Sequence, residues 1–418
     1  MTKSTFWHPF ADMKAVSDTG ALAISHGEGA YVYDSSGRRY LDATASLWYC
    51  NVGHGREEIG RAAEQQMARI AAYSTFGDLT NGPIEELAGR LATVAPFKDA
   101  TVFFTSGGSD CVDSALKMIR RYWVAVGEPE RRTMISRETS YHGMHVAGTG
   151  LAGIDANRAH YGELIPDVVR VRWDSAEDLA KTIDTIGAER VGAFFCEPVI
   201  GAGGVFYPPD GYLAEVQRIC RDSGVLLVAD EVVTGYGRVG RWFASQRYGI
   251  EPDIVISAKG LTSGYLPMGA LLIAPRVSEP FYDGTVGLWR HGYTYSGHAS
   301  VAAAALANLD ILVRESLIER VLEMEGELEQ ALRPLAGHTL ISEVRTGEGL
   351  MAAVQIDPEV IRKDPGLPAR VILGMREAGV MSRALATGAV HVSPSFVITH
   401  QQLAELAAGI RAGLDSVT

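Results

Sequence analysis

The sequence predicts an α/β protein with a mostly parallel sheet and a second, smaller α+β unit. From residue 100 onward, short runs rich in β-branched and aromatic residues alternate with segments of helical apolar spacing, which is typical of a parallel sheet covered by helices. The length of 418 residues exceeds that of one ordinary domain and suits a large domain with a smaller companion.

The first elements are expected to be a hairpin and two helices. Residues 30–34 alternate between turn-forming residues 25–29 and 35–37, which predicts the hairpin. Apolar residues recur at helical spacing from 56 to 94 and are interrupted at Asn81-Gly82-Pro83. The strands of the large sheet are then expected at residues 101–104, 168–171, 191–195, 225–228 and 253–256.

The C-terminal part of the chain predicts a separate α+β unit. A charged helical segment covers 311–335, and strand-like stretches follow at 344–356 and 390–398 with helical residues between them. The predicted organisation is an N-terminal segment 1–55 that joins the small domain, a large domain at 56–305 and a C-terminal small domain at 306–418.

The composition disfavours several classes of function. Apolar residues make up 47% of the chain and charged residues 21%, which is ordinary for a globular protein. The net charge of -12 repels nucleic acid and anionic lipid. The four cysteines form no metal-binding pattern, and no apolar run suits a membrane span or a secretory signal. We therefore expect a cytoplasmic protein without a bound metal, a membrane contact or a nucleic-acid partner.

A glycine-rich turn follows the first strand of the sheet. Ser106-Gly107-Gly108-Ser109 comes between a strand and a helix, where free backbone amides can hold a phosphate group. Such glycines also occur in ordinary tight turns. The turn lacks the lysine of a nucleoside-triphosphate loop and the glycine spacing of a dinucleotide site, so a nucleotide ligand is disfavoured.

Two later strands end in polar residues of the kind that carry chemistry. Asp230 follows the apolar run 225–228, at the edge where open α/β sheets bind ligands, although a lone aspartate would also suit a helix cap. Lys259 comes just after the expected strand 253–256, whose last three residues are apolar. Burial would lower the pKa of its amine and leave a nucleophile able to form an imine.

The three features together match the requirements of pyridoxal 5'-phosphate (PLP). The turn would hold the phosphate, Asp230 would stabilise the protonated pyridine nitrogen, and Lys259 would hold the cofactor as a Schiff base. The sequence therefore predicts a PLP enzyme with Asp230 and Lys259 as catalytic residues.

The motifs around these residues resemble those of the class III (omega) aminotransferases of PLP fold type I. Asp230-Glu231-Val232 and Ser257-Ala258-Lys259-Gly260 carry the resemblance. Further matching motifs run along nearly the whole chain: Gly53-His54-Gly55, Tyr141-His142-Gly143, Glu197-Pro198-Val199, and residues 235–238, 267–270 and 294–298. The resemblance implies a large domain with a mostly parallel seven-stranded sheet, a smaller α+β domain built from both ends of the chain, and a homodimer with shared active sites.

The resemblance also implies roles for individual residues. Tyr141 and Val232 would pack on opposite faces of the pyridine ring, and Thr294 would reach the phosphate bound in the neighbouring subunit. The residues implied to bind the cofactor are Gly107, Gly108, Ser109, Tyr141, His142, Glu197, Asp230, Val232, Lys259 and Thr294.

Two positions depart from the family pattern. The family usually has Asn-Ser-Gly-Ser where this chain has Ser106-Gly107-Gly108-Ser109, which implies one side-chain hydrogen bond fewer to the phosphate and slightly weaker cofactor binding. Ala299 stands where a proline is usual, which affects the shape of that turn but not Thr294.

The pattern is most similar to that of omega-amine:pyruvate aminotransferases. It implies ping-pong transfer of an amino group from a primary amine or omega-amino acid to a keto acid such as pyruvate, with Lys259 moving the proton. Arg383 matches an arginine that swings in to bind a carboxylate and out to admit an apolar amine, although a solvated surface arginine is the plain alternative. The segment Leu47-Trp48-Tyr49-Cys50 and Phe76 resemble the aromatic lining of the substrate pocket, with Trp48 and Phe76 as the expected substrate-binding residues, but they would also suit a core.

Other activities stay open. Trp7-His8-Pro9-Phe10 resembles the start of diaminopelargonate aminotransferases of biotin synthesis, but Met144 stands where those enzymes have an acidic residue after Tyr-His-Gly. Fold type I also supports aminomutases and racemases, which use the same lysine and aspartate without a keto-acid acceptor. A requirement for pyruvate would distinguish an aminotransferase from these isomerases.

Overall fold

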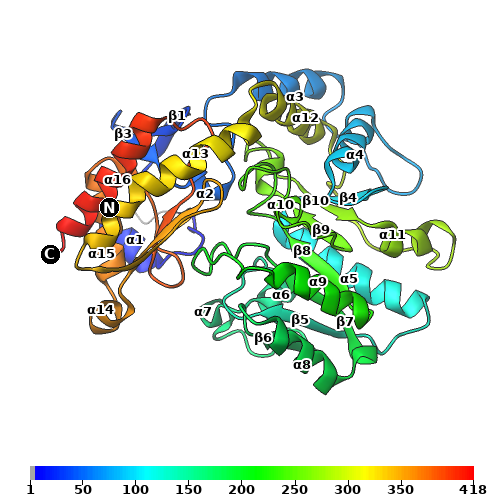
Figure 1. Cartoon of the computed structure of the whole chain (residues 1–418). Coiled ribbons are helices and arrows are strands. Elements are labelled where there is room, and N and C mark those ends of the chain that lie inside the picture. The colour runs from blue at the N-terminus through cyan, green and yellow to red at the C-terminus, as the bar shows by residue number, and fades with distance from the viewer. Residues whose placement is uncertain (1–4) are drawn as a thin grey trace.

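The computed structural model describes residues 5–418, and its larger part is built on a seven-stranded sheet (Figure 1). The strands are β4 (Thr101–Thr105), β5 (Thr133–Arg137), β6 (Val168–Val171), β7 (Val191–Cys196), β8 (Leu226–Asp230), β9 (Ile254–Ser257) and β10 (Gly269–Ile273). Their order in the sheet is β4-β10-β9-β8-β7-β5-β6. Neighbours pair in parallel, except that β10 is antiparallel to both β4 and β9. The predicted α/β fold with a mostly parallel sheet is confirmed.

Both faces of this sheet are covered by helices, because its central strands β7, β8 and β9 are buried and are apolar except at the carboxyl ends of β8 and β9. In β7, Phe194 packs in a cluster with α8 (Ala176–Ile186) and α9 (Tyr212–Asp222). Its neighbour Phe195 packs in a second cluster with α5 (Gly108–Ala125). Successive side chains of a strand point to opposite faces. Continuous apolar runs are therefore what a sheet between two helical layers requires.

The structure adds two strands, β5 and β10, to those expected from the sequence. All residues of β5 are buried, including the charged Arg137. The Arg137 guanidinium donates hydrogen bonds to the carbonyl oxygens of Trp173 and Glu197. These partners on distant segments satisfy the charge of Arg137. In the sequence, the same charge disfavours the prediction of a buried strand at β5.

The predicted helices between residues 56 and 94 are α3 (Glu57–Arg69) and α4 (Gly82–Val94). The Asn81 side chain caps α4 by accepting a hydrogen bond from the Ile84 amide at 3.1 Å. The helical segment 311–335 is divided, because α12 (Ala299–Arg314) ends before Ser316 and α13 (Leu317–Leu332) begins after it. The left-handed φ of 49° at Ser316 breaks the helix. The remaining helices here are α6 (Val146–Leu151), α7 (Asp155–Arg158), α10 (Ala244–Arg247) and α11 (Pro275–Tyr282).

Segments from the two ends of the chain meet in one small sheet. The predicted hairpin is formed by β1 (Ile24–Glu28) and β2 (Tyr31–Asp34), which pair antiparallel. Strand β3 (Arg39–Asp42) continues the hairpin and pairs in parallel with β13 (Val380–Met381). The labels N and C accordingly lie on the same side of the molecule in Figure 1. The proposed boundaries at residues 55 and 305 stay predictions.

A second small sheet completes the C-terminal unit. It consists of β11 (Ile341–Arg345), β12 (Ala352–Ile356) and β14 (Val390–Val392), all antiparallel. Strands β12 and β14 fall in the stretches predicted as strand-like, whereas β11 begins three residues before the predicted stretch 344–356. The helices of the terminal regions are α1 (Met13–Thr19), α2 (Ala45–Trp48), α14 (Pro358–Lys363), α15 (Leu367–Glu377) and α16 (His400–Asp415).

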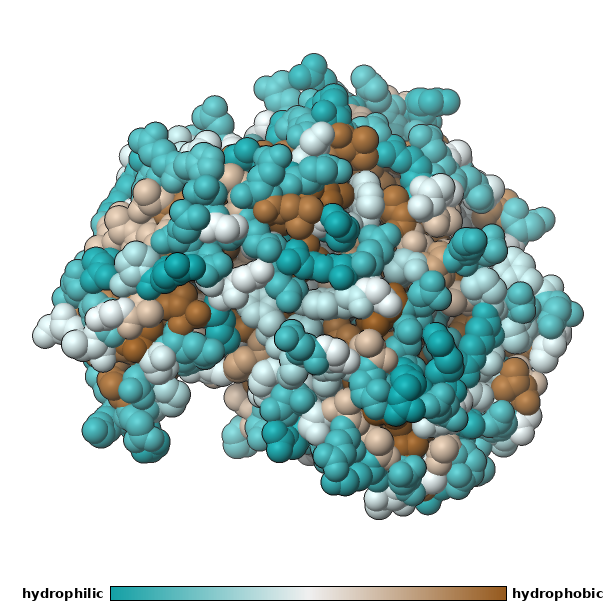
Figure 2. Space-filling model, viewed as in Figure 1, coloured by the Kyte–Doolittle hydropathy of each residue, from teal (hydrophilic) through white to brown (hydrophobic). Residues whose placement is uncertain are grey.

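Polar residues cover most of the face shown in Figure 2, where apolar residues form separate patches. No helix within residues 5–418 is long and apolar enough to cross a bilayer. All four cysteines are free and buried.

Candidate active site

A cavity of about 390 Å³ lies beside the ends of β4, β8 and β9, a size that suits a small ligand. Asp230 ends β8, and Lys259 follows β9. Parallel strands bring their carboxyl ends to one edge of a sheet, which explains why these residues meet. The predicted site residues that line the cavity are Gly107, Gly108, Ser109, Tyr141, His142, Glu197, Asp230, Val232 and Lys259.

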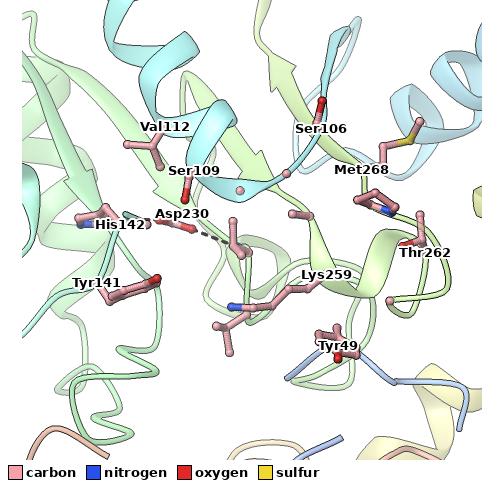
Figure 3. Close-up of a pocket in the computed structure, with 18 of the residues that line it drawn as sticks. Tyr49, Ser106, Ser109, Val112, Tyr141, His142, Asp230, Lys259, Thr262 and Met268 are labelled. Carbon is pink, nitrogen blue, oxygen red and sulfur yellow. Dashed lines mark hydrogen bonds and ion pairs between the residues drawn. The ribbon is translucent and has the colours of Figure 1, made fainter. Parts of the chain in front are cut away.

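Lys259 lies where β9 gives way to a tight turn. Its backbone has a φ of 42°, a left-handed conformation that is strained for a residue other than glycine. Figure 3 shows its side chain extending into the space below Asp230 and towards Tyr141. Burial lowers the pKa of the Lys259 amine to about 8, although the charge of Asp230 opposes this shift. A substantial fraction of the amine is therefore neutral and nucleophilic near physiological pH.

Asp230 is held rigidly in the cavity wall. One carboxylate oxygen lies 2.8 Å from His142 Nδ1, and the other accepts a hydrogen bond from the Val232 amide at 3.1 Å. Only 5% of Asp230 and 1% of His142 are exposed. A buried carboxylate that is fixed in this way can stabilise a cation in the cavity without reorganising.

The turn before α5 forms a cradle of backbone amides. The helix starts at Gly108, so the amides of Gly108 and Ser109 lack a carbonyl partner within it and are free to bind an anion. A Cβ atom at Gly108 would lie 3.2 Å from the methyl groups of Val232. This close approach explains a glycine at that position. Ser109 Oγ accepts a hydrogen bond from the Met144 amide at 3.1 Å, which leaves its hydroxyl proton available.

Glu197 fixes the segment that carries Tyr141. Its two carboxylate oxygens accept hydrogen bonds from the amides of Tyr141 and Gly201, at 2.9 and 3.0 Å. Burial raises the pKa of this carboxyl group. Glu197 thus acts on the cavity mainly by placing the Tyr141 ring opposite Lys259, as seen in Figure 3.

These parts fit PLP. The cradle supplies free amides for a phosphate, Asp230 supplies a fixed carboxylate for a pyridinium nitrogen, and Lys259 supplies an amine of lowered pKa for an aldehyde. Among the residues described, no group of three or more histidine, cysteine and acidic side chains could hold a metal ion.

Three predicted residues lie elsewhere. Trp48 is 2% exposed and stacks on His391, with ring centroids 3.7 Å apart, and its neighbour Tyr49 lines the cavity instead. Phe76 is 57% exposed, and Thr294 is also exposed; neither lines this cavity. The backbone explains why Tyr49 lines the cavity in place of Trp48. Left-handed φ angles at Ser46 and Trp48 interrupt the regular alternation of side-chain directions in this segment.

Arg383 is partly buried next to the cavity. Its charge acts on both Tyr141 and Lys259, and burial lowers the pKa of its guanidinium. Within residues 5–418 no carboxylate forms an ion pair with it. The plain alternative of a solvated surface arginine does not describe this position.

Sequence reasoning missed several contributors to the site. Thr262 and Met268 line the cavity beside Tyr49, and His391 contacts Arg383. The sequence indicated these residues only by their position beside predicted ones, since Tyr49 stands next to Trp48 and Met268 lies in one of the matching motifs.

Comparisons with known proteins agree with this geometry. The chain matches the family "Aminotransferase class-III" over residues 13–414. The putrescine--pyruvate aminotransferase of Pseudomonas aeruginosa is 39% identical over 430 residues, which cover 97% of this chain and 93% of that protein. The omega-amino acid--pyruvate aminotransferase of Pseudomonas putida is 34% identical over 374 residues, covering 84% of this chain and 83% of its own length.

Solved structures are similar over the whole chain. An amine transaminase from an uncultivated Pseudomonas species, in its PLP-bound form, has a TM-score of 0.94 and 34% identity and covers 100% of both chains. A transaminase from the marine bacterium Virgibacillus has a TM-score of 0.95 and 35% identity, covering 99% of this chain and 97% of that one. The chain therefore belongs to the class III aminotransferases, which use PLP as their cofactor.

Proposed function

We propose that this aminotransferase moves the amino group of a primary amine or omega-amino acid to a keto acid, with pyruvate as the acceptor. The observation that carries the proposal concerns Arg383, which has no carboxylate partner among the residues described. Its charge acts on both Lys259 and Tyr141, which line the cavity. The names of the relatives support the acceptor, since both act with pyruvate.

The chain's own residues would hold the cofactor. The amides of Gly108 and Ser109 and the Ser109 hydroxyl would bind its phosphate, and Asp230 would bind its pyridinium nitrogen. Tyr141 and Val232, which both line the cavity, would cover the two faces of its ring. When bound, PLP supplies an electron sink that makes the C–H bond beside the transferred amino group acidic.

Lys259 would be the proton carrier of the reaction. In the first half-reaction its Nζ takes a proton from the carbon of the donor that bears the amino group. In the second half-reaction the same atom delivers a proton to the carbonyl carbon of the acceptor. A pKa of about 8 suits both directions, because the amine gains and loses a proton easily near neutral pH.

Arg383 would recognise the carboxylate of the keto acid. A guanidinium binds a carboxylate through two parallel N–H···O bonds, which fixes the orientation as well as the charge of the substrate. Burial at this position strengthens such a pair by excluding water. Tyr49, with its ring in the cavity wall, would contact the apolar part of the donor.

We infer a homodimer with shared active sites. Thr294 and Phe76 lie outside the cavity of their own chain, as residues donated to a neighbouring subunit would. Large apolar residues near Phe76 are also exposed, which is typical of an interface: Met67, Ile70, Tyr73 and Leu79. Trp48, which is buried against His391, would support the substrate end of the cavity without lining it.

The four free, buried cysteines support the proposal of a reducing, cytoplasmic location. Each thiol is held within the protein core and none is paired. A secreted enzyme with the same cysteines would be expected to use some of them in disulfides.

A panel of donors and acceptors tests the proposed reaction. Purified holoenzyme would be assayed with 1-phenylethylamine, beta-alanine or putrescine as donor, and with pyruvate or 2-oxoglutarate as acceptor. We expect turnover with pyruvate, no turnover when the keto acid is left out, and ping-pong kinetics. Rearrangement of an amino substrate without a keto acid would instead indicate an isomerase. S-adenosylmethionine is included as a further donor, and activity with this donor alone would indicate the biotin-pathway enzyme.

A further inference from the structure

Arg383 is held by a histidine that has no assigned role. Arg383 Nε donates a hydrogen bond to His391 Nδ1 at 3.3 Å. The backbone reinforces this pairing, because the His391 amide donates to the Arg383 carbonyl oxygen at 3.0 Å. His391 lies in β14, and Arg383 lies just beyond β13. The guanidinium is therefore anchored through Nε, while its two terminal nitrogens stay available.

The surroundings of His391 determine which of its nitrogens carries the proton. Ser393 Oγ lies 2.6 Å from His391 Nε2 and itself donates to the Thr44 carbonyl oxygen at 3.2 Å. Arginine can only donate, so Nδ1 must accept and Nε2 must carry the proton. The sequence of bonds from Arg383 to Thr44 is then consistent, with one donor and one acceptor in each bond.

His391 stays neutral in this position. It is 0% exposed, and its pKa lies well below the usual range because of burial and the nearby cations Arg383, Arg238 and Lys259. The Trp48 ring stacks on it, with centroids 3.7 Å apart. The imidazole can therefore neither rotate freely nor become a cation that would repel Arg383.

We propose that His391 is a positioning residue for Arg383, whose guanidinium it holds beside the cavity so that substrates bearing a carboxylate are favoured over apolar amines. The proposal rests on the role in carboxylate binding proposed above for Arg383. A position of Arg383 directed away from the cavity would leave Nδ1 of His391 without this donor inside the protein, and an unsatisfied buried acceptor is unfavourable. His391 thus shifts the arginine towards its carboxylate-binding position.

The test compares two substitutions of His391 in the holoenzyme. His391→Leu removes the acceptor, and His391→Asn keeps an oxygen near the position of Nδ1. We expect His391→Leu to raise the KM for pyruvate about tenfold, the effect of losing a hydrogen bond to a charged group, with kcat changed by less than about twofold. His391→Asn should restore most of the affinity. The ratio of kcat/KM for 1-phenylethylamine to that for beta-alanine should rise about tenfold in His391→Leu.

A second measurement does not depend on turnover. Propionate carries a carboxylate but no keto group, so its inhibition constant against pyruvate reports binding alone. We expect this constant to rise about tenfold in His391→Leu and to recover in His391→Asn. If His391→Leu fails to fold, His391→Gln replaces it, because its amide reaches Ser393 but leaves the Nδ1 position without an acceptor.

Arg383→Ala separates the two proposals. If this variant leaves the KM for pyruvate unchanged, Arg383 does not bind the carboxylate. The proposed role of Arg383 and the proposed role of His391 then both fail. If it raises KM while His391→Leu does not, only the role of His391 is overturned. His391→Leu should add nothing further in the Arg383→Ala background, and an equal tenfold increase there would also overturn the role of His391.

Discussion

The two ends of the cavity are built in different ways. At the cofactor end, Asp230, Lys259 and the cradle follow three strands of one sheet, and His142 holds the carboxylate in place. At the substrate end, Tyr49 and Arg383 come from segments near opposite ends of the chain. The cofactor end is thus set by one rigid element, whereas the substrate end depends on how distant segments meet. We expect substitutions at the cofactor end to affect every substrate and those at the substrate end to change selectivity.

The largest effect is expected for Lys259→Ala. The variant loses the only proton carrier proposed at the cavity, so kcat should fall by more than about a thousandfold with every donor. Lys181→Ala is the matched control, because Lys181 is exposed on α8 and pairs with Glu177. Initial rates with two donors and pyruvate give the comparison, and a Lys259→Ala enzyme that kept transaminating would overturn the mechanism.

Asp230→Asn should have the next largest effect. The substitution keeps the shape of the side chain but removes the charge that would stabilise a pyridinium nitrogen, and we expect kcat to fall about a hundredfold. The decrease should be the same for 1-phenylethylamine and beta-alanine, since Asp230 lies at the cofactor end. Asp222→Asn, on the exposed end of α9, serves as the control. A decrease for only one donor would contradict the proposed division of the cavity.

The sequence could predict the cofactor end because local patterns determine it. Asp230 directly follows the apolar run 225–229, Lys259 comes three residues after the run 254–256, and the glycines of the cradle follow another strand. Strand β5 escaped prediction because Arg137 finds its partners on distant segments. Tyr49 lines the cavity in place of Trp48 because of left-handed backbone angles, which a periodic pattern of apolar residues cannot reveal. Contacts made only in the folded chain, such as that between Arg383 and His391, leave no local signal.

The pH dependence of cofactor capture tests whether the pKa of the Lys259 amine is lowered. Only the neutral amine can attack an aldehyde, and the pKa of Lys259 is about 8. The rate at which apoenzyme captures PLP should therefore rise about tenfold per pH unit below pH 8 and level off above it. Stopped-flow absorbance at constant ionic strength measures this rate. In Asp230→Asn the midpoint should move to lower pH, because the charge of Asp230 raises the pKa of Lys259. A rate that still increased at pH 10 would indicate an ordinary, solvated lysine.

The smallest effect is expected for substitutions of the two glycines of the cradle, Gly107 and Gly108. Adding a side chain should strengthen PLP binding at Gly107 and weaken it at Gly108. A Cβ atom at Gly107 would meet nothing within 4 Å, and its φ of 174° is extended backbone that any residue adopts. Gly107→Ser therefore adds a hydroxyl group for the phosphate, and we expect the dissociation constant of PLP to fall about threefold to tenfold. Gly108→Ala places its methyl group 3.2 Å from Val232, which should weaken binding. Fluorescence titration of apoenzyme with PLP measures both constants. Equal weakening by both substitutions would show that the cradle has no space for a side chain at either position, and that the phosphate is held by backbone amides alone.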